Sequence, residues 1–493
     1  MGGSGTSMPW PAHPLVYEVH TWAWLGELEH AAGRRLTLAD VPETEIERLA
    51  ALGFDALWLM GVWQRSPRGR EIARSHAGLH GAYQAALPDW AEHDIVGSPY
   101  AVHAYRVDPY LGGDEALARL RERLRAHGLR LVLDFVPNHL AVDHAWTESD
   151  PTLFVRPSEE HLAARPHDAF RNARGEALAH GRDPYFDGWT DTVQLDYRRA
   201  AVRRAMRETL CDLAGRCDGL RCDMAMLVLR DVFRRTWGGD FEAPGDEFWP
   251  EAIAMVKRAH PAFVFIAEVY WGLERELHLQ GFDYTYDKRL YDLLRAREHD
   301  RLSAHLRSGL EEQSRHVRFV ENHDEERAAD AFGDPWGRGA ALFALALPGL
   351  RLVHEGQLEG RRRKLPVQLG RRADESADAA LACFYQALLP MLADPEWRAG
   401  AWAPLDLPPG VVGYRWTLGD RARIVVANLW GEPARCRVPS ALLGLDGTGS
   451  LGVRERFASA PWAQASASIE GEEVAIEVPG LAARLLEVGA CTA

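Results

Sequence analysis

The sequence predicts an α/β fold: a (β/α)8 TIM barrel with an insertion subdomain after strand 3 and a C-terminal all-β sandwich domain. Three observations support this prediction. Eight short aliphatic runs alternate with longer amphipathic stretches, one long irregular segment follows the third run, and short alternating runs begin after Pro395. Strands that alternate with helices are typical of βα units in a parallel sheet, and eight such units fit a closed barrel.

Most of the eight candidate strands end in polar or charged residues. In chain order they cover residues 15–20, 56–60, 129–135, 219–223, 263–268, 282–286, 317–321 and 350–354. Helical patterns lie between them: in residues 115–127, Leu117, Leu120 and Leu124 fall on one face, and Gly128 follows as a C-cap. Because such barrels carry their active site at the carboxyl ends of the strands, the residues that follow these runs are the candidates for chemistry.

These patterns divide the chain of 493 residues into domains. Residues 1–10 lack the charged and apolar stretches of a secretion signal, so we expect a cloning scar or a disordered N-terminus. We assign residues 11–138 and 193–395 to the barrel, 139–192 to the insertion, and 396–493 to the β-sandwich.

Charge and apolar patterning argue against two classes of partner. With 57 Lys and Arg against 71 Asp and Glu, the net charge of −14 provides no basic surface for nucleic acids or anionic lipids. The longest apolar run, residues 340–353, is shorter than the ~20 residues of a membrane helix. We therefore expect no nucleic-acid or membrane partner, and the sequence leaves the oligomeric state open.

Cysteine usage indicates a reducing compartment. The six cysteines include no CxxC pair and are too few for a disulfide framework in so long a chain. We therefore expect reduced thiols, a cytoplasmic protein and no zinc site. The basic run Arg361, Arg362, Arg363 and Lys364 could form a local anion site, but such runs are more often solvated surface, so we assign it no role.

Four segments place polar groups directly after candidate strands. They are LVLDFVPNH (131–139), DGLRCDMAM (218–226), FVFIAEVYW (263–271) and RFVENHDEE (318–326). A closed barrel would bring all four to one face. Each segment alone has a structural explanation, but four that converge indicate an active site.

Two carboxylates in these segments suit paired catalysis. Arg221 and Asp223 are two residues apart, so in a strand they point the same way, and the cation favours the ionised carboxylate that a nucleophile needs. Glu268 follows an apolar run and precedes aromatic residues, surroundings that favour the protonated form of a general acid. A structural Arg–Asp pair and an exposed strand-end glutamate are the alternatives.

The other candidates have weaker support. Asp324, beside His323, could stabilise a positively charged, sugar-like transition state, although so acidic a run also fits a solvated loop. His139 ends the third segment, where a structural histidine is the alternative. Trp271, just past Glu268, is the tryptophan that we expect near the pocket, because indoles are common sugar platforms.

In this order and on these strands, the four segments resemble the four signature regions of the α-amylase family of retaining α-glycoside hydrolases and transglycosidases. The resemblance extends over nearly the whole chain and includes the insertion, whose motif TVQLDY (192–197) also resembles one of the family. It implies that Asp223 is the nucleophile, Glu268 the general acid/base and Asp324 the transition-state stabiliser.

The resemblance also implies roles in binding. Arg221 would hold the nucleophile ionised, His139 and His323 would bind hydroxyls of the sugar at the cleavage point, and Tyr100 in GSPYAVHAY would stack under that sugar. The implied chemistry is double displacement with retention, with the two carboxyls ~5–5.5 Å apart and no organic cofactor.

Two departures from the family pattern narrow the prediction. Met226 and Leu227 stand where many α-amylases have a Lys-His pair that contacts sugars on the leaving-group side, which argues against long starch chains. Asn138 matches a calcium ligand of many amylases, but Leu227 replaces the partner histidine, and TWAWLGELEH replaces the calcium loop after the first strand. Calcium is therefore not supported, and metal binding stays open.

The residues and the resemblance together predict a cytoplasmic α-glucosidase-like hydrolase that acts on short α-glucosides or α-gluco-oligosaccharides. A transglycosidase or sugar isomerase would use the same glycosyl-enzyme intermediate, with a sugar acceptor in place of water. A barrel that binds sugars or proteins without catalysis is the second alternative, which the three carboxylates disfavour. The sequence does not separate hydrolysis from transfer.

Overall fold

A computed structural model of the chain describes residues 8–242, 247–443, 451–459 and 467–490. Eight parallel strands close into a barrel in the order β1-β14-β13-β12-β11-β10-β5-β2. The strands are β1 (Leu15–His20), β2 (Ala56–Met60), β5 (Arg130–Phe135), β10 (Gly219–Cys222), β11 (Val264–Ala267), β12 (Tyr284–Tyr286), β13 (His316–Arg318) and β14 (Leu350–His354). The predicted barrel is confirmed, and each candidate run supplies one of its strands.

Some strands end before the polar residues that the sequence placed in them. Asp223 and Glu268 lie just past β10 and β11, yet the Asp223 N–H still donates to Phe135 O (2.8 Å) and the Glu268 N–H to Cys222 O (3.0 Å). Both residues therefore keep a backbone hydrogen bond to the neighbouring strand. The two side chains stand on a rigid base, as a preorganised site requires.

Helices surround the barrel because each buries one apolar face. In α5 (Gly113–Ala126), Leu117, Leu120 and Leu124 are buried, and Gly128 follows with a left-handed φ of 77°. Full burial of one leucine side chain contributes about 1.5–3 kcal/mol. This confirms the helix predicted there.

Further helices complete the outer layer. They are α1 (Thr21–Ala32), α2 (Glu43–Ala51), α3 (Pro67–Ser75), α4 (Ala77–Ala86), α8 (Ala200–Ala214), α9 (Arg230–Trp237), α10 (Phe248–Ala259), α11 (Glu274–Leu279), α12 (Lys288–Ala296), α13 (His299–Leu306), α14 (Leu310–Gln313), α15 (Ala328–Ala331), α16 (Trp336–Leu345), α17 (Ala379–Met391) and α18 (Glu396–Ala399). Within the described ranges, none is long and apolar enough to cross a membrane.

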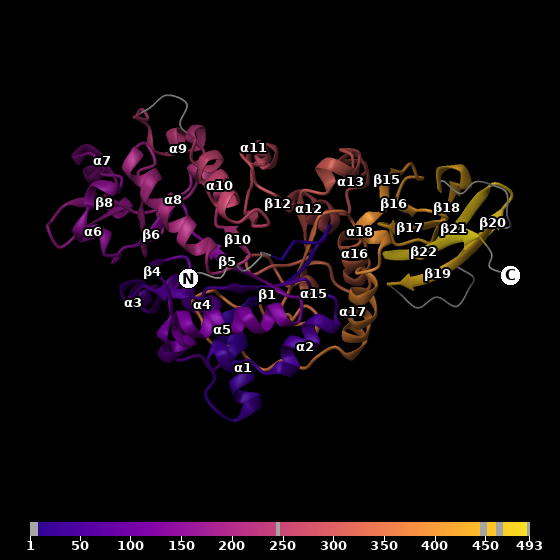
Figure 1. Ribbon diagram of the computed structural model, residues 1–493, viewed down its shortest axis with the longest axis horizontal. Coiled ribbons are helices and arrows are strands. Elements are labelled where there is room, and N and C mark those ends of the chain that lie inside the picture. Colours follow the sequence, from indigo (N-terminus) through magenta and orange to yellow (C-terminus); the bar gives the residue numbers. More distant parts are fainter. Residues whose placement is uncertain (1–7, 243–246, 444–450, 460–466, 491–493) are drawn as a thin grey trace.

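The predicted insertion follows the third barrel strand and lies at the left of Figure 1. In it, β6 (His139–Ala141) pairs antiparallel with β9 (Thr192–Gln194), and β7 (Ala169–Arg171) with β8 (Ala177–Ala179). Two short helices, α6 (Trp146–Ser149) and α7 (Glu159–Ala164), lie between them in the chain. A separate antiparallel pair, β3 (Trp63–Arg65) and β4 (Val102–Val107), follows β2.

The C-terminal strands form two antiparallel sheets at the opposite end of the molecule (Figure 1). One sheet has the order β15 (Ala401–Leu405), β16 (Val411–Leu418), β17 (Arg421–Asn428), β22 (Ala482–Ala490), β19 (Leu451–Ala458), and the other β18 (Ala434–Pro439), β21 (Glu473–Val478), β20 (Ala467–Glu470). Tyr414 and Trp416 of β16 donate to the backbone of Phe343 (2.6 Å) and Ala346 (3.0 Å), which ties this region to the barrel.

The predicted all-β character of the C-terminal region is thus confirmed. The residue limits of the domains stay predictions. At the other end of the chain, residues 1–7 of the expected scar lie outside the described residues. Trp10 is described, and its indole N–H donates to Asp218 O at 3.3 Å.

Candidate active site

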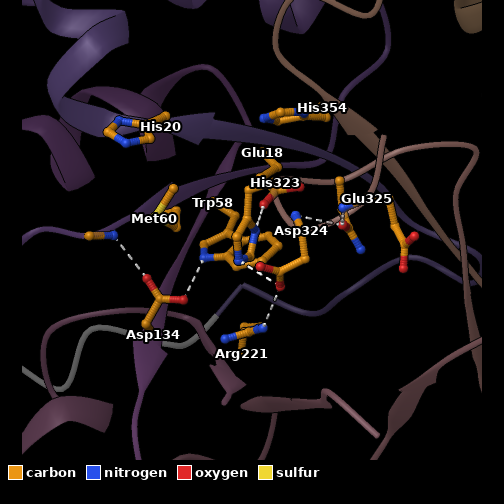
Figure 2. Close-up of polar contacts among 12 residues, drawn as sticks. Glu18, His20, Trp58, Met60, Asp134, Arg221, His323, Asp324, Glu325 and His354 are labelled. Carbon is orange, nitrogen blue, oxygen red and sulfur yellow. Dashed lines mark hydrogen bonds and ion pairs between the residues drawn. The ribbon is translucent and has the colours of Figure 1, made fainter. Parts of the chain in front are cut away.

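Arg221 lies at the centre of the candidate residues. Its buried guanidinium donates from Nη1 to Asp223 Oδ1 (2.7 Å) and from Nη2 to Glu268 Oε2 (2.6 Å). Asp324 Oδ2 lies 3.8 Å from the same Nη2, a contact that Figure 2 shows. One cation therefore brings together three carboxylates that are far apart in the sequence.

The three carboxylates differ in exposure. The side chains of Asp223 and Glu268 are 8% and 4% exposed, whereas that of Asp324 is 41% exposed. Burial raises the pKa of Asp223 well above its ordinary value; the Arg221 guanidinium opposes this rise and the nearby Glu268 adds to it. Arg221 thus acts in the direction that the sequence predicts, but burial outweighs it.

Glu268 is fixed by two further donors. The Tyr270 hydroxyl donates to Oε1 (2.8 Å), and the Met224 N–H donates to Oε2 (2.8 Å). Trp271, which the sequence singled out, is 40% exposed, and its ring meets the ring of Tyr185 edge-on at 5.0 Å. The aromatic residue that contacts Glu268 is therefore Tyr270, and Trp271 lies further out.

His323 joins Asp324 to a buried acid on β1. Its Nδ1 contacts Glu18 and its Nε2 faces Asp324 Oδ2 (3.0 Å), as Figure 2 shows. The same Nε2 also lies 2.6 Å from the Tyr100 hydroxyl. Burial works against the charged ring, but Asp324 and Glu18 raise the pKa of His323 to about 10. His323 is therefore an imidazolium near neutral pH.

The charge of His323 acts in turn on Asp324. Burial favours the neutral acid, but His323 and Arg221 outweigh it and hold the pKa of Asp324 well below its usual range. Asp324 is thus an ionised carboxylate at the mouth of the site. A fixed negative charge at such a position stabilises a positive charge that develops nearby.

Tyr100 and His139 lie beside this cluster. The Tyr100 ring lies under the Arg221 guanidinium at 5.2 Å and close to parallel with the His323 ring, at 5.6 Å. His139 is buried on β6 and bonds the backbone of Tyr100; burial lowers the pKa of His139 to about 3, so its ring is neutral. Of the eight site residues predicted from sequence, seven are linked by contacts, and Trp271 is not.

The residues expected for calcium do not fit a metal site. The Asn138 amide donates to Gln194 Oε1 (3.2 Å), and the Gln194 amide donates back to Asn138 Oδ1 (2.9 Å). Leu227 is buried and offers no ligand atom. Among the described residues, no group of three or more His, Cys, Asp or Glu could hold a metal ion, and we derive no step through calcium.

Sequence reasoning missed two acids that point into the barrel. Glu18 is buried beside His323, and Asp134 accepts hydrogen bonds from Trp58 Nε1 (3.2 Å) and the Gly61 N–H (3.0 Å), as Figure 2 shows. Burial raises the pKa of Asp134 to about 6. A single acid inside an apolar strand run, as in LVYEVH and LVLDF, was the available signal, since a buried carboxylate needs partners.

Comparisons with known proteins give the family and the fold of the chain. The family model "Alpha amylase, catalytic domain" matches residues 44–402. A solved maltogenic alpha-amylase, AmyB from Thermotoga neapolitana, superposes with a TM-score of 0.69 at 20% identity over 96% of this chain and 98% of its own, which shows the same fold.

Curated relatives are longer than this chain. The alpha-amylase MalA of Haloarcula japonica is 24% identical over 464 residues, which cover 89% of this chain and 58% of the relative. An α-1,4-glucan:maltose-1-phosphate maltosyltransferase of Pseudomonas aeruginosa is 25% identical over 252 residues, 49% of this chain and 31% of the relative. Because the catalytic-domain model covers most of the chain, this protein belongs to the alpha-amylase family.

Proposed function

We propose that this protein is a retaining α-glycoside hydrolase that cleaves short α-glucosides or α-gluco-oligosaccharides through a covalent glycosyl-enzyme intermediate. The observation that carries the proposal is the guanidinium of Arg221, which bonds Asp223 and Glu268 at the same time. Retaining enzymes need their two carboxyls ~5–5.5 Å apart, and inverting enzymes ~6.5–9.5 Å. Two carboxylates held on one guanidinium favour the shorter spacing.

In the proposed first step, Glu268 protonates the glycosidic oxygen while Asp223 attacks the anomeric carbon and forms a glycosyl ester. Glu268, now a carboxylate, then takes a proton from water, and the resulting hydroxide displaces Asp223 with overall retention. Asp324 supplies the negative charge that stabilises the oxocarbenium-like transition states. The Tyr100 ring offers an apolar face for the CH groups of the sugar.

The preference for short substrates has its own support. Met226 and Leu227 are buried, so neither offers a polar group to sugars on the leaving-group side. A long glucan chain would lose the hydrogen bonds that charged or polar side chains provide there. Binding energy in this protein would come from the sugar at the cleavage point and its immediate neighbours.

Transfer to a sugar acceptor is the second candidate function. Several relatives carry names of transferring enzymes, among them the maltosyltransferase of Pseudomonas aeruginosa and a 1,4-α-glucan branching enzyme of Ralstonia nicotianae that is 26% identical over 392 residues. A transglycosidase or isomerase would use the same ester on Asp223, and the acceptor hydroxyl would replace water. A binding barrel without catalysis is disfavoured because all three carboxylates are in place.

A cytoplasmic location is also part of the proposal. Cys211, Cys217, Cys222, Cys383 and Cys436 are all free thiols. Burial raises the pKa of Cys217 and of Cys222, which keeps these thiols protonated and unreactive.

The decisive experiment traps the intermediate. 5-Fluoro-α-glucosyl fluoride should label the protein, and mass spectrometry of peptides should locate the sugar on Asp223. Asp223→Asn should abolish labelling and lower turnover by ~10³-fold or more, while Asp240→Asn, at a carboxylate 94% exposed, should leave both unchanged.

Product analysis completes the test. Anomer-resolved NMR should show that the first product has the α configuration; a β product, or a label on another residue, would refute the mechanism. Free glucose that grows in step with substrate loss supports hydrolysis, and a rearranged or elongated glycoside supports transfer.

A further inference from the structure

The loop after β14 carries the four cations Arg361, Arg362, Arg363 and Lys364, which we call the basic strap. Sequence analysis gave this run no role. In the structure it borders the candidate active site, because the Lys364 ammonium donates to the main-chain oxygen of Asp324. The strap is therefore part of the wall of the site.

A cavity of about 560 Å3 lies between the basic strap and α4. Its lining combines apolar and charged groups: three alanines of α4, Leu365, Pro366 and Val367, together with Arg362, Arg363, Lys364, His323 and Asp324. Ligand sites typically have volumes of ~300–1,000 Å3. The lining holds three arginine or lysine cations and a single carboxylate, so this cavity favours an anionic group although the whole chain has a net charge of −14.

The cations of the strap are not all neutralised by protein groups. Arg362 pairs with Asp330 (2.6 Å) and Arg361 with Glu27 (2.7 Å). Glu375 accepts the backbone N–H of Arg362 (3.0 Å) and so shapes the strap. For the Arg363 guanidinium, the described part of the chain provides neither a hydrogen-bond acceptor nor an ion-pair partner.

A smaller cavity of about 20 Å3 shares His323 and Arg363 with the first and has room for one water or one ligand oxygen. Arg361 and Arg372 line it; the buried Nη1 of Arg361 has no hydrogen-bond partner among the described residues, whereas Nε of Arg372 lies 3.5 Å from Glu27 Oε1. Glu355 also lines this cavity but is already paired with Arg372. Buried N–H groups without acceptors point to an acceptor that comes from outside the protein.

The position of the cavity indicates which part of the substrate it receives. In the proposed mechanism, on which this step rests, Glu268 gives its proton to the leaving oxygen, so the leaving group lies over Glu268 and Tyr270. The cavity is lined by His323 and Asp324, and by none of Asp223, Glu268 and Tyr270. Because Asp324 acts on the sugar that forms the ester with Asp223, we place the retained part of the substrate next to this cavity.

We infer that this cavity binds the phosphoryl group of a phosphorylated α-glucoside, with the phosphate on the part of the substrate that is retained. A phosphate monoester carries about −1.5 to −2 charges near pH 7 and offers three acceptor oxygens. Arginine forks match this geometry: Arg363 lines both cavities and supplies the principal donors, and the buried Nη1 of Arg361 offers one more in the smaller cavity beside it.

The first test measures binding without turnover. Calorimetry on Asp223→Asn protein should show that glucose 6-phosphate binds at least about tenfold more tightly than glucose at physiological salt. Arg363→Gln should remove about tenfold of this advantage, and Arg363→Lys should keep part of it. The matched control Arg435→Gln, at a side chain 51% exposed on β18 of the C-terminal sheets, should keep all of it.

The second test uses the active enzyme and 4-nitrophenyl α-glucosides with or without a phosphate at O3, O4 or O6. One phosphorylated substrate should have at least about tenfold higher kcat/KM than the neutral glucoside, and Arg363→Gln should reduce that ratio. Equal kcat/KM for all of them would overturn the inference. Inorganic phosphate that binds as tightly as the sugar phosphate and yields glucose 1-phosphate would also overturn it, because phosphate would then be the acceptor.

The two proposals fail in different ways. If the cavity does not bind phosphate, the fluorosugar still labels Asp223 but phosphorylated ligands show no advantage. If the mechanism is wrong, Asp223 stays unlabelled while the binding advantage of glucose 6-phosphate in calorimetry persists.

Discussion

The two sides of Arg221 have different chemistry. On the Asp324 side lie an imidazolium, a buried glutamate and the basic strap, around a cavity of about 560 Å3. On the Glu268 side lie Tyr270 and Trp271; they line a separate cavity of about 400 Å3, whose other residues are mostly charged side chains of both signs from α11, α12 and α13. In the proposed mechanism, the Asp324 side would face the sugar on which positive charge develops. The Glu268 side, with Tyr270 and Trp271, would face the leaving sugar, which dissociates after the first step.

The largest effect is expected on the Glu268 side. Glu268→Gln should lower kcat/KM for an α-linked disaccharide by ~10²–10⁴-fold, because the leaving oxygen loses its proton donor. α-Glucosyl fluoride, whose leaving group needs little protonation, should lose far less. Asp324→Asn should instead slow both substrates alike, since its charge acts on the sugar ring.

Steady-state kinetics with the two substrates checks this contrast, with Glu311→Gln on exposed α14 as the control. If Glu268→Gln slowed the fluoride as much as the disaccharide, the assignment of Glu268 as proton donor would be wrong.

An intermediate effect is expected from Glu18 on the Asp324 side. Glu18→Gln removes one of the two negative charges that raise the pKa of His323, so that pKa should fall below about 10. The folded-state value lies above the 6.5 of a free imidazole, so the charged ring contributes stability that is complete below pH ~6.5 and is lost as the pH rises toward 10. In the variant, this stability should disappear over a lower pH range as the pH rises, because the pKa of His323 in the folded state is lower.

NMR titration of the His323 ring and denaturant unfolding between pH 6 and 10 measure both changes. At pH 7 we expect a loss of about 1–3 kcal/mol in the free energy of unfolding, the cost of weakening a buried charged hydrogen bond. An unchanged His323 titration would show that Glu18 does not set the charge of this side.

The smallest effect is expected from Trp271 on the aromatic rim. Trp271→Ala removes an edge-to-face contact with Tyr185 and an exposed apolar surface, so KM for glucosides with an extended leaving group should rise about 2- to 10-fold. The rate of the chemical step should change little, and Trp271→Phe should restore most of the affinity. A matching rise in KM for α-glucosyl fluoride would contradict a role on the leaving-group side.

Candidate site residues could be predicted from the sequence where a local pattern, an apolar run, is followed directly by a residue of suitable chemistry. Asp223, Glu268 and Asp324 could be found because each follows an apolar run, and a barrel brings such positions to one face. The contact between Glu18 and His323 joins residues 305 positions apart in the chain, so no local pattern contains it. The basic run looked like solvated surface because its place beside Asp324 depends on the path of an irregular loop.

The aromatic residues near Glu268 also show that local sequence does not predict which side chains make contact. Trp271 was singled out for its position just after Glu268, yet the neighbouring Tyr270 makes the hydrogen bond. Trp271 has a φ of 65°, in the left-handed region, so the chain turns there and carries the indole away from the acid. The spacing of residues along a strand predicts the direction of their side chains only as far as the strand extends.

The shared guanidinium has one more consequence for the proposed cycle. Although burial raises the pKa of Asp223, the proposed cycle starts from the state in which Asp223 is the anion and the proton of the pair is on Glu268; in the glycosyl ester, Asp223 is neutral and Glu268 is the anion. Because Arg221 bonds both acids, it faces one unit of negative charge in each half-reaction without moving. In the proposed cycle, the negative charge beside Arg221 would therefore be the same before and after the ester forms, and little of the barrier would be spent on reorganising this buried centre.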